Sequence, residues 1–322
     1  MTEVTKDIKV PLKLRLESWW NGYDLDDVKA RLLAHQNDMG LSDIKITSAA
    51  VENNKDTSMA WHKLRMQMMQ LIWGEGYCGP GGTEHIQSMC KLLTMNSEMS
   101  AIVIGAGLGG PSRVLAEEFG VWITGYELSK ELATQGMKIS EDQGFASKAI
   151  IKHLDPEQDS PFDRHFDRAF SKEALYGFPN KEKILQDTFD TLKNGALFLI
   201  TDYTLTNMES LNNPDVQEWL KQEAELPFPV TATIMKDALE KAGFSLRVNE
   251  DISQEYIELI EHSWSKAAVI AKELASKGEE GIKAIESLME EAEHWALRAK
   301  ILKEGHLHVW RFLANKPNEE IR

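Results

Sequence analysis

The pattern of apolar and polar positions divides the chain into two parts. Residues 1–72 show helical spacing, as at Val28, Leu32 and Leu33, and a run rich in Met, Leu and Trp continues to Trp73. We interpret this first part as a helical N-terminal extension that serves as a lid. Residues 73–322 are predicted to form a second, larger domain.

In the second part, short apolar runs alternate with segments of helical periodicity. That order predicts an α/β fold in which a mainly parallel sheet has helices on both faces. A long acidic helical segment, residues 254–303, separates the last two apolar runs, so we expect a helical insertion that covers the carboxyl ends of the strands. The last of seven strands is expected to run antiparallel to the other six. The predicted strands are 101–104, 120–126, 149–152, 166–170, 196–201, 244–248 and 307–313.

A glycine-rich turn, residues 105–110, follows the first predicted strand, and the second strand ends at Glu127. Glycine permits a tight turn and a close approach of the backbone to a ligand, and the helix after the turn offers free N–H groups. Glu127 can accept hydrogen bonds from both hydroxyls of a ribose. The motif therefore predicts a nucleotide site, which suits either a dinucleotide or S-adenosylmethionine (SAM).

A second glycine-rich stretch, residues 73–85, precedes the first strand. Its five glycines and one proline indicate unusual backbone angles, which favours a loop that contacts a ligand over a purely structural one. Thr83 is predicted to cap the helix that follows.

Polar side chains also follow the other predicted strands. Asp155, Lys172–Glu173 and Asp202–Tyr203 each stand where an apolar run ends. Ligands of parallel sheets bind at the carboxyl ends of the strands. These side chains are therefore expected to join Glu127 in one site.

The composition limits the kinds of partner that the protein is expected to bind. The formal net charge of −15 argues against nucleic acid, which requires a basic face. Only Cys78 and Cys90 are present, without metal-ligand spacing, so no metal is expected. The N-terminal residues lack the apolar core of a signal peptide, and no apolar run is long enough to span a membrane. We predict a cytoplasmic protein without integral membrane contact; a homodimer is compatible with the sequence.

Two observations favour SAM over a dinucleotide. One hundred residues precede the glycine turn, and Gly-Asp, common in the second cofactor segment of flavin enzymes, does not occur. An acid after the third strand, Asp155, is placed to meet an adenine amino group. A glycine turn followed by acids after strands two and three is typical of SAM-dependent methyltransferases.

At this point the chain resembles a known family, the phosphoethanolamine N-methyltransferases. The resemblance covers about residues 65–316 and is strongest at 74–84, 105–110, 171–175 and 199–203. Cyclopropane-fatty-acid-synthase-like methyltransferases are similar more distantly. The resemblance implies the class I methyltransferase fold, a Rossmann-like seven-stranded sheet. It also implies that SAM is the cofactor, bound by Tyr77, Gly79, Gly105, Gly107, Gly109, Glu127, Leu128, Leu154, Asp155, Ser171 and Lys172.

The sequence departs from that family where the acceptor is expected. The family's arginine–aspartate pair after strand four is Lys172–Glu173 here, and its histidine four residues beyond falls on Gly177. Positions associated with the phosphate carry Glu223 and Glu225. We therefore predict methyl transfer to a small molecule or lipid head group, most simply N-methylation of an amine, by a pocket that has diverged from phosphoethanolamine. The candidate catalytic residues are Glu173, Tyr203 and His262.

Two alternatives are compatible with the sequence. One is a flavin- or nicotinamide-dependent oxidoreductase, because the glycine motif alone does not exclude it. The other is a non-catalytic SAM-binding protein, because the family's tyrosine–histidine pair is absent.

Overall fold

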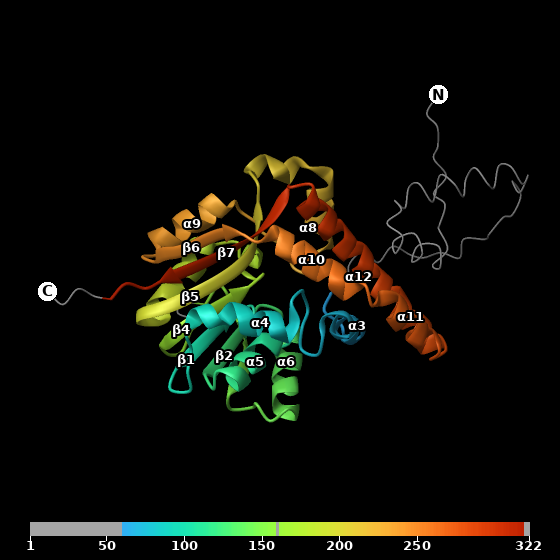
Figure 1. Ribbon diagram of the computed structural model, residues 1–322, viewed down its shortest axis with the longest axis horizontal. Coiled ribbons are helices and arrows are strands. Elements are labelled where there is room, and N and C mark those ends of the chain that lie inside the picture. The colour runs from blue at the N-terminus through green and yellow to red at the C-terminus, as the bar shows by residue number, and fades with distance from the viewer. Residues whose placement is uncertain (1–59, 159–160, 319–322) are drawn as a thin grey trace, which may run out of the picture. The chain divides into compact units, whose positions relative to one another are not determined.

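A computed structural model describes residues 60–158 and 161–318. They form a seven-stranded sheet in the order β3-β2-β1-β4-β5-β7-β6 (Figure 1). Strand β7 pairs antiparallel with both of its neighbours, and β1 to β5 pair in parallel. The predicted sheet, with its antiparallel last strand, is confirmed. The strands are β1 (Ser100–Ile104), β2 (Trp122–Glu127), β3 (Ala149–His153), β4 (Phe166–Lys172), β5 (Leu192–Leu205), β6 (Ser245–Asp251) and β7 (Leu307–Asn315).

The helices divide into three groups by their contacts. In the first group, α5 (Gly110–Glu118) and α6 (Lys130–Asp142) pack along β2 and β3, and α4 (Gly82–Cys90) packs on α5. The second packs on β5 and β6: α7 (Lys181–Thr191) and α9 (Ala232–Lys241). The third group joins distant parts of the chain: α3 (Lys63–Trp73), α8 (Pro214–Gln222), α10 (Ser253–Trp264), α11 (Ala267–Ala275) and α12 (Glu279–Lys303). Figure 1 shows α3, α10 and α12 side by side.

The main core lies under α7 and α9. Leu185 and Leu239 from these helices are fully buried against Phe198 of β5 and Phe312 of β7. Burial of each such side chain contributes roughly 1.5–3 kcal/mol. The core thus fixes the strands whose carboxyl ends carry the polar residues.

Helices α9 and α4 begin in different ways. Thr231 caps α9, because its hydroxyl accepts a hydrogen bond from the Ile234 N–H at 3.2 Å. The predicted cap at Thr83 is wrong: α4 begins at Gly82 after Gly81. The Thr83 hydroxyl instead forms a hydrogen bond with the Tyr77 hydroxyl at 3.2 Å, within the glycine-rich stretch 73–85.

Helix α3 is held to the insertion helices α10 and α12. The indole of Trp73 packs edge-on against that of Trp264, with ring centres 6.1 Å apart, and its ring centre lies 4.6 Å from that of Trp295. Arg65 forms a buried ion pair with Glu291 of α12. Residues 1–59 of the predicted extension lie outside the described residues, so the division at residue 72 stays a prediction. Within the described ranges, no helix has the length and apolar character needed to cross a bilayer.

Candidate active site

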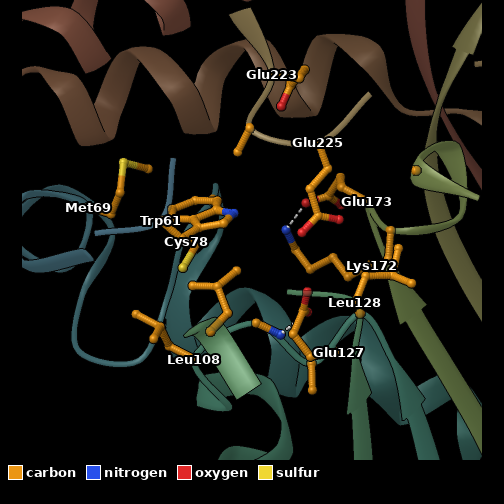
Figure 2. A pocket seen from close by; sticks show the side chains of 18 of the residues that line it. Trp61, Met69, Cys78, Leu108, Glu127, Leu128, Lys172, Glu173, Glu223 and Glu225 are labelled. Carbon is orange, nitrogen blue, oxygen red and sulfur yellow. Dashed lines mark hydrogen bonds and ion pairs between the residues drawn. The ribbon is translucent and has the colours of Figure 1, made fainter. Parts of the chain in front are cut away.

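A cavity lies where the glycine turn after β1 meets the ends of β2, β4 and β5. Helices α3 and α12 and the segment 223–225 close its other side. Figure 2 shows Trp61 on one wall and the Lys172–Glu173 pair and Glu225 on the other, all directed into the same space. The cavity therefore forms between the sheet and the third helix group.

The glycine turn has the conformation that its sequence predicts. Gly105 and Gly107 adopt φ values of +77° and +54°, in the left-handed region. A Cβ on Gly105 would lie 2.0 Å from the Ala174 Cβ, whereas a Cβ on Gly107 would meet no protein atom within 4 Å. Gly105 is thus needed for packing against the segment after β4, and Gly107 leaves room beside the cavity.

Glu127 is held at the end of β2 by the turn itself. Its carboxylate accepts hydrogen bonds from the Gly107 N–H at 2.7 Å and from the Ser129 N–H at 3.0 Å. Burial raises the pKa of Glu127 to about 7, and these two N–H groups oppose the rise. Each oxygen accepts one bond here and keeps a further lone pair, so the carboxylate can also accept ribose hydroxyls.

The second glycine loop packs onto the turn. The Gly110 N–H donates to the Gly76 carbonyl at 2.9 Å, and a Cβ on Gly110 would lie 2.5 Å from that oxygen. Gly110 therefore serves loop packing. Tyr77 and Gly79 line the cavity, and a Cβ on Gly79 would lie 3.8 Å from the Trp295 ring and 3.9 Å from Glu173 Oε2.

Glu173 has an unusual backbone conformation, and neighbouring side chains donate hydrogen bonds to its carboxylate. Its φ is +43°, which is rare for a non-glycine residue. Its carboxylate forms an ion pair with Lys172 and accepts hydrogen bonds from the Tyr256 hydroxyl and, at 2.9 Å, from the Thr201 hydroxyl. Side chains from α10 and β5 thus fix Glu173 in the cavity wall.

Aromatic rings and a second buried ion pair form the wall beyond Glu173. Tyr176 packs edge-on against Tyr203 at 5.4 Å, and Arg298 pairs with Glu223. Burial by itself would raise the pKa of Glu223, but Arg298 and His294 outweigh it and lower that pKa to about 2. Glu223 is therefore ionised and neutralised by Arg298.

The predicted site residues fall into two sets. Those that line the cavity are Tyr77, Gly79, Gly105, Gly107, Glu127, Leu128, Lys172, Glu173 and Tyr203. Those that do not line it are Gly109, Leu154, Asp155, Ser171 and His262.

The second set has physical reasons for its position. Gly109 is the N-cap of α5, Leu154 belongs to the core cluster, and the buried Ser171 lies in register with Ile104 inside the sheet. Asp155 is exposed and caps the following turn by accepting from the Glu157 N–H. His262 is exposed on α10, so its position gives no support to a catalytic role.

Several residues of the cavity wall were not predicted from the sequence. Trp61, Arg65, His294 and Arg298 line the cavity, and Tyr256 reaches it through Glu173. They come from α3, α10, α12 and the segment ahead of α3, far from the glycine motif. The resemblance to a known family, which extends to about residue 316, was the one sequence signal that reached α12.

This sheet order, with a glycine turn after β1 and a buried acid closing β2, defines the class: the protein is a SAM-dependent methyltransferase. The model of the mycolic acid cyclopropane synthetase family matches residues 82–295. The chain belongs to that family. The oxidoreductase and non-catalytic alternatives are set aside by this assignment.

Individual relatives differ in their acceptors. Phosphoethanolamine N-methyltransferase of Plasmodium falciparum is 25% identical over 213 residues, 66% of this chain and 76% of that protein. Sterol 24-C-methyltransferase of Yarrowia lipolytica is 27% identical over 179 residues, 54% of this chain and 47% of that protein. The chain thus spans less than half of the sterol enzyme.

Solved structures show the same fold. Phosphoethanolamine N-methyltransferase 2 of Haemonchus contortus, in complex with SAM, gives a TM-score of 0.67 at 20% identity and covers 79% of this chain and 57% of that one. A cyclopropane synthase of Mycobacterium tuberculosis gives a TM-score of 0.64 at 17% identity, covering 82% and 99%.

The residues around the glycine turn fit SAM. One wall of the cavity offers open space beside Gly107, the acceptor lone pairs of Glu127 and the apolar side chain of Leu128. Glu127 would hold the ribose.

Affinity for S-adenosylhomocysteine is expected to fall as the pH drops below about 7. Protonation of Glu127, whose pKa is about 7, removes the charge that accepts the ribose hydroxyls. Each pH unit below that pKa should weaken binding about tenfold. The folding stability of the ligand-free protein has the opposite pH dependence. The folded protein holds the Glu127 proton more tightly than the unfolded chain, so the contribution of this group to stability is lost as the pH rises from about 4.5 through 7.

Titration calorimetry between about pH 5 and pH 8 tests the binding trend. The Glu127→Gln variant is the control, since it cannot titrate and should show a flat profile apart from ligand ionisation. Equal pH dependence in both proteins would contradict the assignment.

Proposed function

We propose that this methyltransferase methylates the nitrogen of a small amine and that phosphoethanolamine is a poor acceptor. The observation that carries the proposal is the charge of the cavity wall. Four carboxylates line it among the described residues: Glu127, Glu173, Glu223 and Glu225. Each of the three lysine and arginine side chains on the same described wall is already ion-paired: Arg65 with Glu291, Lys172 with Glu173, and Arg298 with Glu223.

A phosphate would therefore meet a wall without net positive charge. Glu223 and Glu225 occupy the positions associated with the phosphate in the resembled family, but Arg298 neutralises the carboxylate of Glu223. No lysine or arginine of the described ranges forms an ion pair with Glu225, and burial, together with the charge of Glu131, raises the pKa of Glu225. At an effective dielectric of about 20, one close contact between like charges costs about 4 kcal/mol. A neutral or cationic amine avoids that cost.

Bound SAM supplies a methyl group activated by its sulfonium charge. The protein's part is to align the acceptor and exclude water. Glu173 is positioned to accept an N–H bond from an amine, since Lys172, Thr201 and Tyr256 hold its carboxylate in place. Tyr203 lies on the same wall. We propose Glu173 and Tyr203 as the groups closest to the transferred methyl; the homodimer and the cytoplasmic location also stay predictions.

In a methyl-transfer assay with labelled SAM, unphosphorylated amines are expected to be methylated with a higher kcat/KM than phosphoethanolamine. One unfavourable contact of about 4 kcal/mol corresponds to roughly a thousandfold difference. Glu225→Gln should narrow the gap, because it removes the charge that faces the phosphate. Efficient turnover of phosphoethanolamine by the unaltered enzyme would refute the proposal, and label transferred only to carbon in a lipid extract would replace the amine with a carbon acceptor.

A further inference from the structure

The guanidinium of Arg298 lies inside a group of aromatic rings on the acceptor wall. Its central carbon is 4.2 Å from the ring centre of Trp295, 5.1 Å from that of Tyr203 and 5.8 Å from that of Trp219. We call these three rings the cation box. Tyr203 and Trp295 line the cavity, and Trp219 is fully buried behind them.

A carboxylate completes the cation box. Glu223 pairs with Arg298 and accepts a hydrogen bond from the Trp219 indole N–H at 2.5 Å. Arg298 also lies 2.8 Å from His294 Nε2. The rings, the carboxylate and the guanidinium therefore hold one another in place.

Aromatic faces around a carboxylate are the arrangement by which proteins bind alkylammonium ions. Here a side chain of the protein itself occupies that position. From this geometry we infer that Arg298 is a specificity-determining residue: it fills an alkylammonium site and keeps cationic acceptors out of it. This inference rests on the proposed function, because it directs the amine of the acceptor toward Glu173 and Glu225 instead.

A purely structural ion pair would have a different consequence. Removing Arg298 would then only destabilise the fold, because Glu223 would be left buried and uncompensated. If the cation box is a blocked site, removing Arg298 should in addition create affinity for a quaternary ammonium ion. These two outcomes can be measured separately.

The probe is tetramethylammonium chloride, with sodium chloride at equal ionic strength as the reference. Binding to the full chain is followed by tryptophan fluorescence and by calorimetry, with S-adenosylhomocysteine present. Arg298→Ala is expected to bind the probe at least about tenfold more tightly than the unaltered protein, since each desolvated cation–π contact contributes up to about 2 kcal/mol. Arg298→Lys keeps a cation in the cation box and should not gain affinity.

A folded Arg298→Ala protein that binds S-adenosylhomocysteine but not the probe would overturn the inference, as would equal probe affinity in the unaltered protein. If the single variant does not fold, Arg298→Ala combined with Glu223→Gln leaves no uncompensated charge and keeps the three rings. That double variant should still bind the probe more tightly than the unaltered protein, and no gain there also overturns the inference. Probe binding requires no methyl transfer, so failure of the amine proposal would be seen separately, in the turnover assay.

Discussion

Replacing Arg65 with methionine is expected to lower the free energy of unfolding by about 3–5 kcal/mol. The guanidinium pairs with Glu291 across α3 and α12, and both side chains are almost completely buried, at 4% and 2% exposure. The substitution keeps most of the volume but leaves the Glu291 carboxylate buried without this partner. Urea unfolding at neutral pH measures the loss as a lower midpoint with an unchanged slope.

The double variant Arg65→Met with Glu291→Leu is the matched control. It removes both charges, so it should recover most of the lost stability or exceed the original value. Lys241 and Glu182 form an exposed ion pair, and Lys241→Met should change stability by less than about 1 kcal/mol. Equal effects at the buried and exposed pairs would show that the contact between α3 and α12 does not stabilise the protein as argued.

Glu127→Ala is expected to weaken S-adenosylhomocysteine binding about 10- to 150-fold. Charge-assisted hydrogen bonds to the ribose contribute roughly 1.5–3 kcal/mol, and each 1.4 kcal/mol is about a tenfold change in affinity. The Gly107 N–H also loses its acceptor, which loosens the turn beside the ligand. Calorimetric titration gives the affinity directly.

The Asp155→Ala variant is compared with Glu127→Ala to test where the cofactor binds. Asp155 follows the neighbouring strand β3 but is exposed and does not line the cavity. Its replacement should leave the affinity for S-adenosylhomocysteine nearly unchanged. If Asp155→Ala lost as much affinity as Glu127→Ala, the cofactor would extend beyond the cavity described for the glycine turn.

The sheet could be predicted because its signals are local. Apolar runs such as 101–104 and 196–201 are long enough to identify buried strands, and the glycine turn marks where the first strand meets its helix. The full extent of β5, Leu192–Leu205, was not predicted. Its polar residues Asp202–Thr204 are in the sheet because β7 pairs along them, which is a tertiary effect.

The site was predicted less completely, for a geometric reason. The carboxyl-end rule predicted that Glu127 and Glu173 lie close together, and both line the cavity, but the rule could not tell that Asp155 faces solvent. On α10, Tyr256, Ile260 and Trp264 recur every fourth residue and form the buried face, whereas His262 lies off that face. The ion pairs Arg65–Glu291 and Arg298–Glu223 join segments far apart in the sequence, and no local pattern reveals such partners.

The position of β7 has a consequence for how the chain assembles. It lies between β5 and β6, so β6 has no neighbour in the sheet until the segment 307–315 has left the ribosome. Helix α3, near the start of the described chain, likewise waits for α12 before its buried arginine is paired. Such long-range closures slow folding and expose apolar edges meanwhile. A nascent chain halted before residue 307 should therefore be a strong chaperone client with no cofactor affinity. The ability to bind the cofactor should be acquired in a single late step.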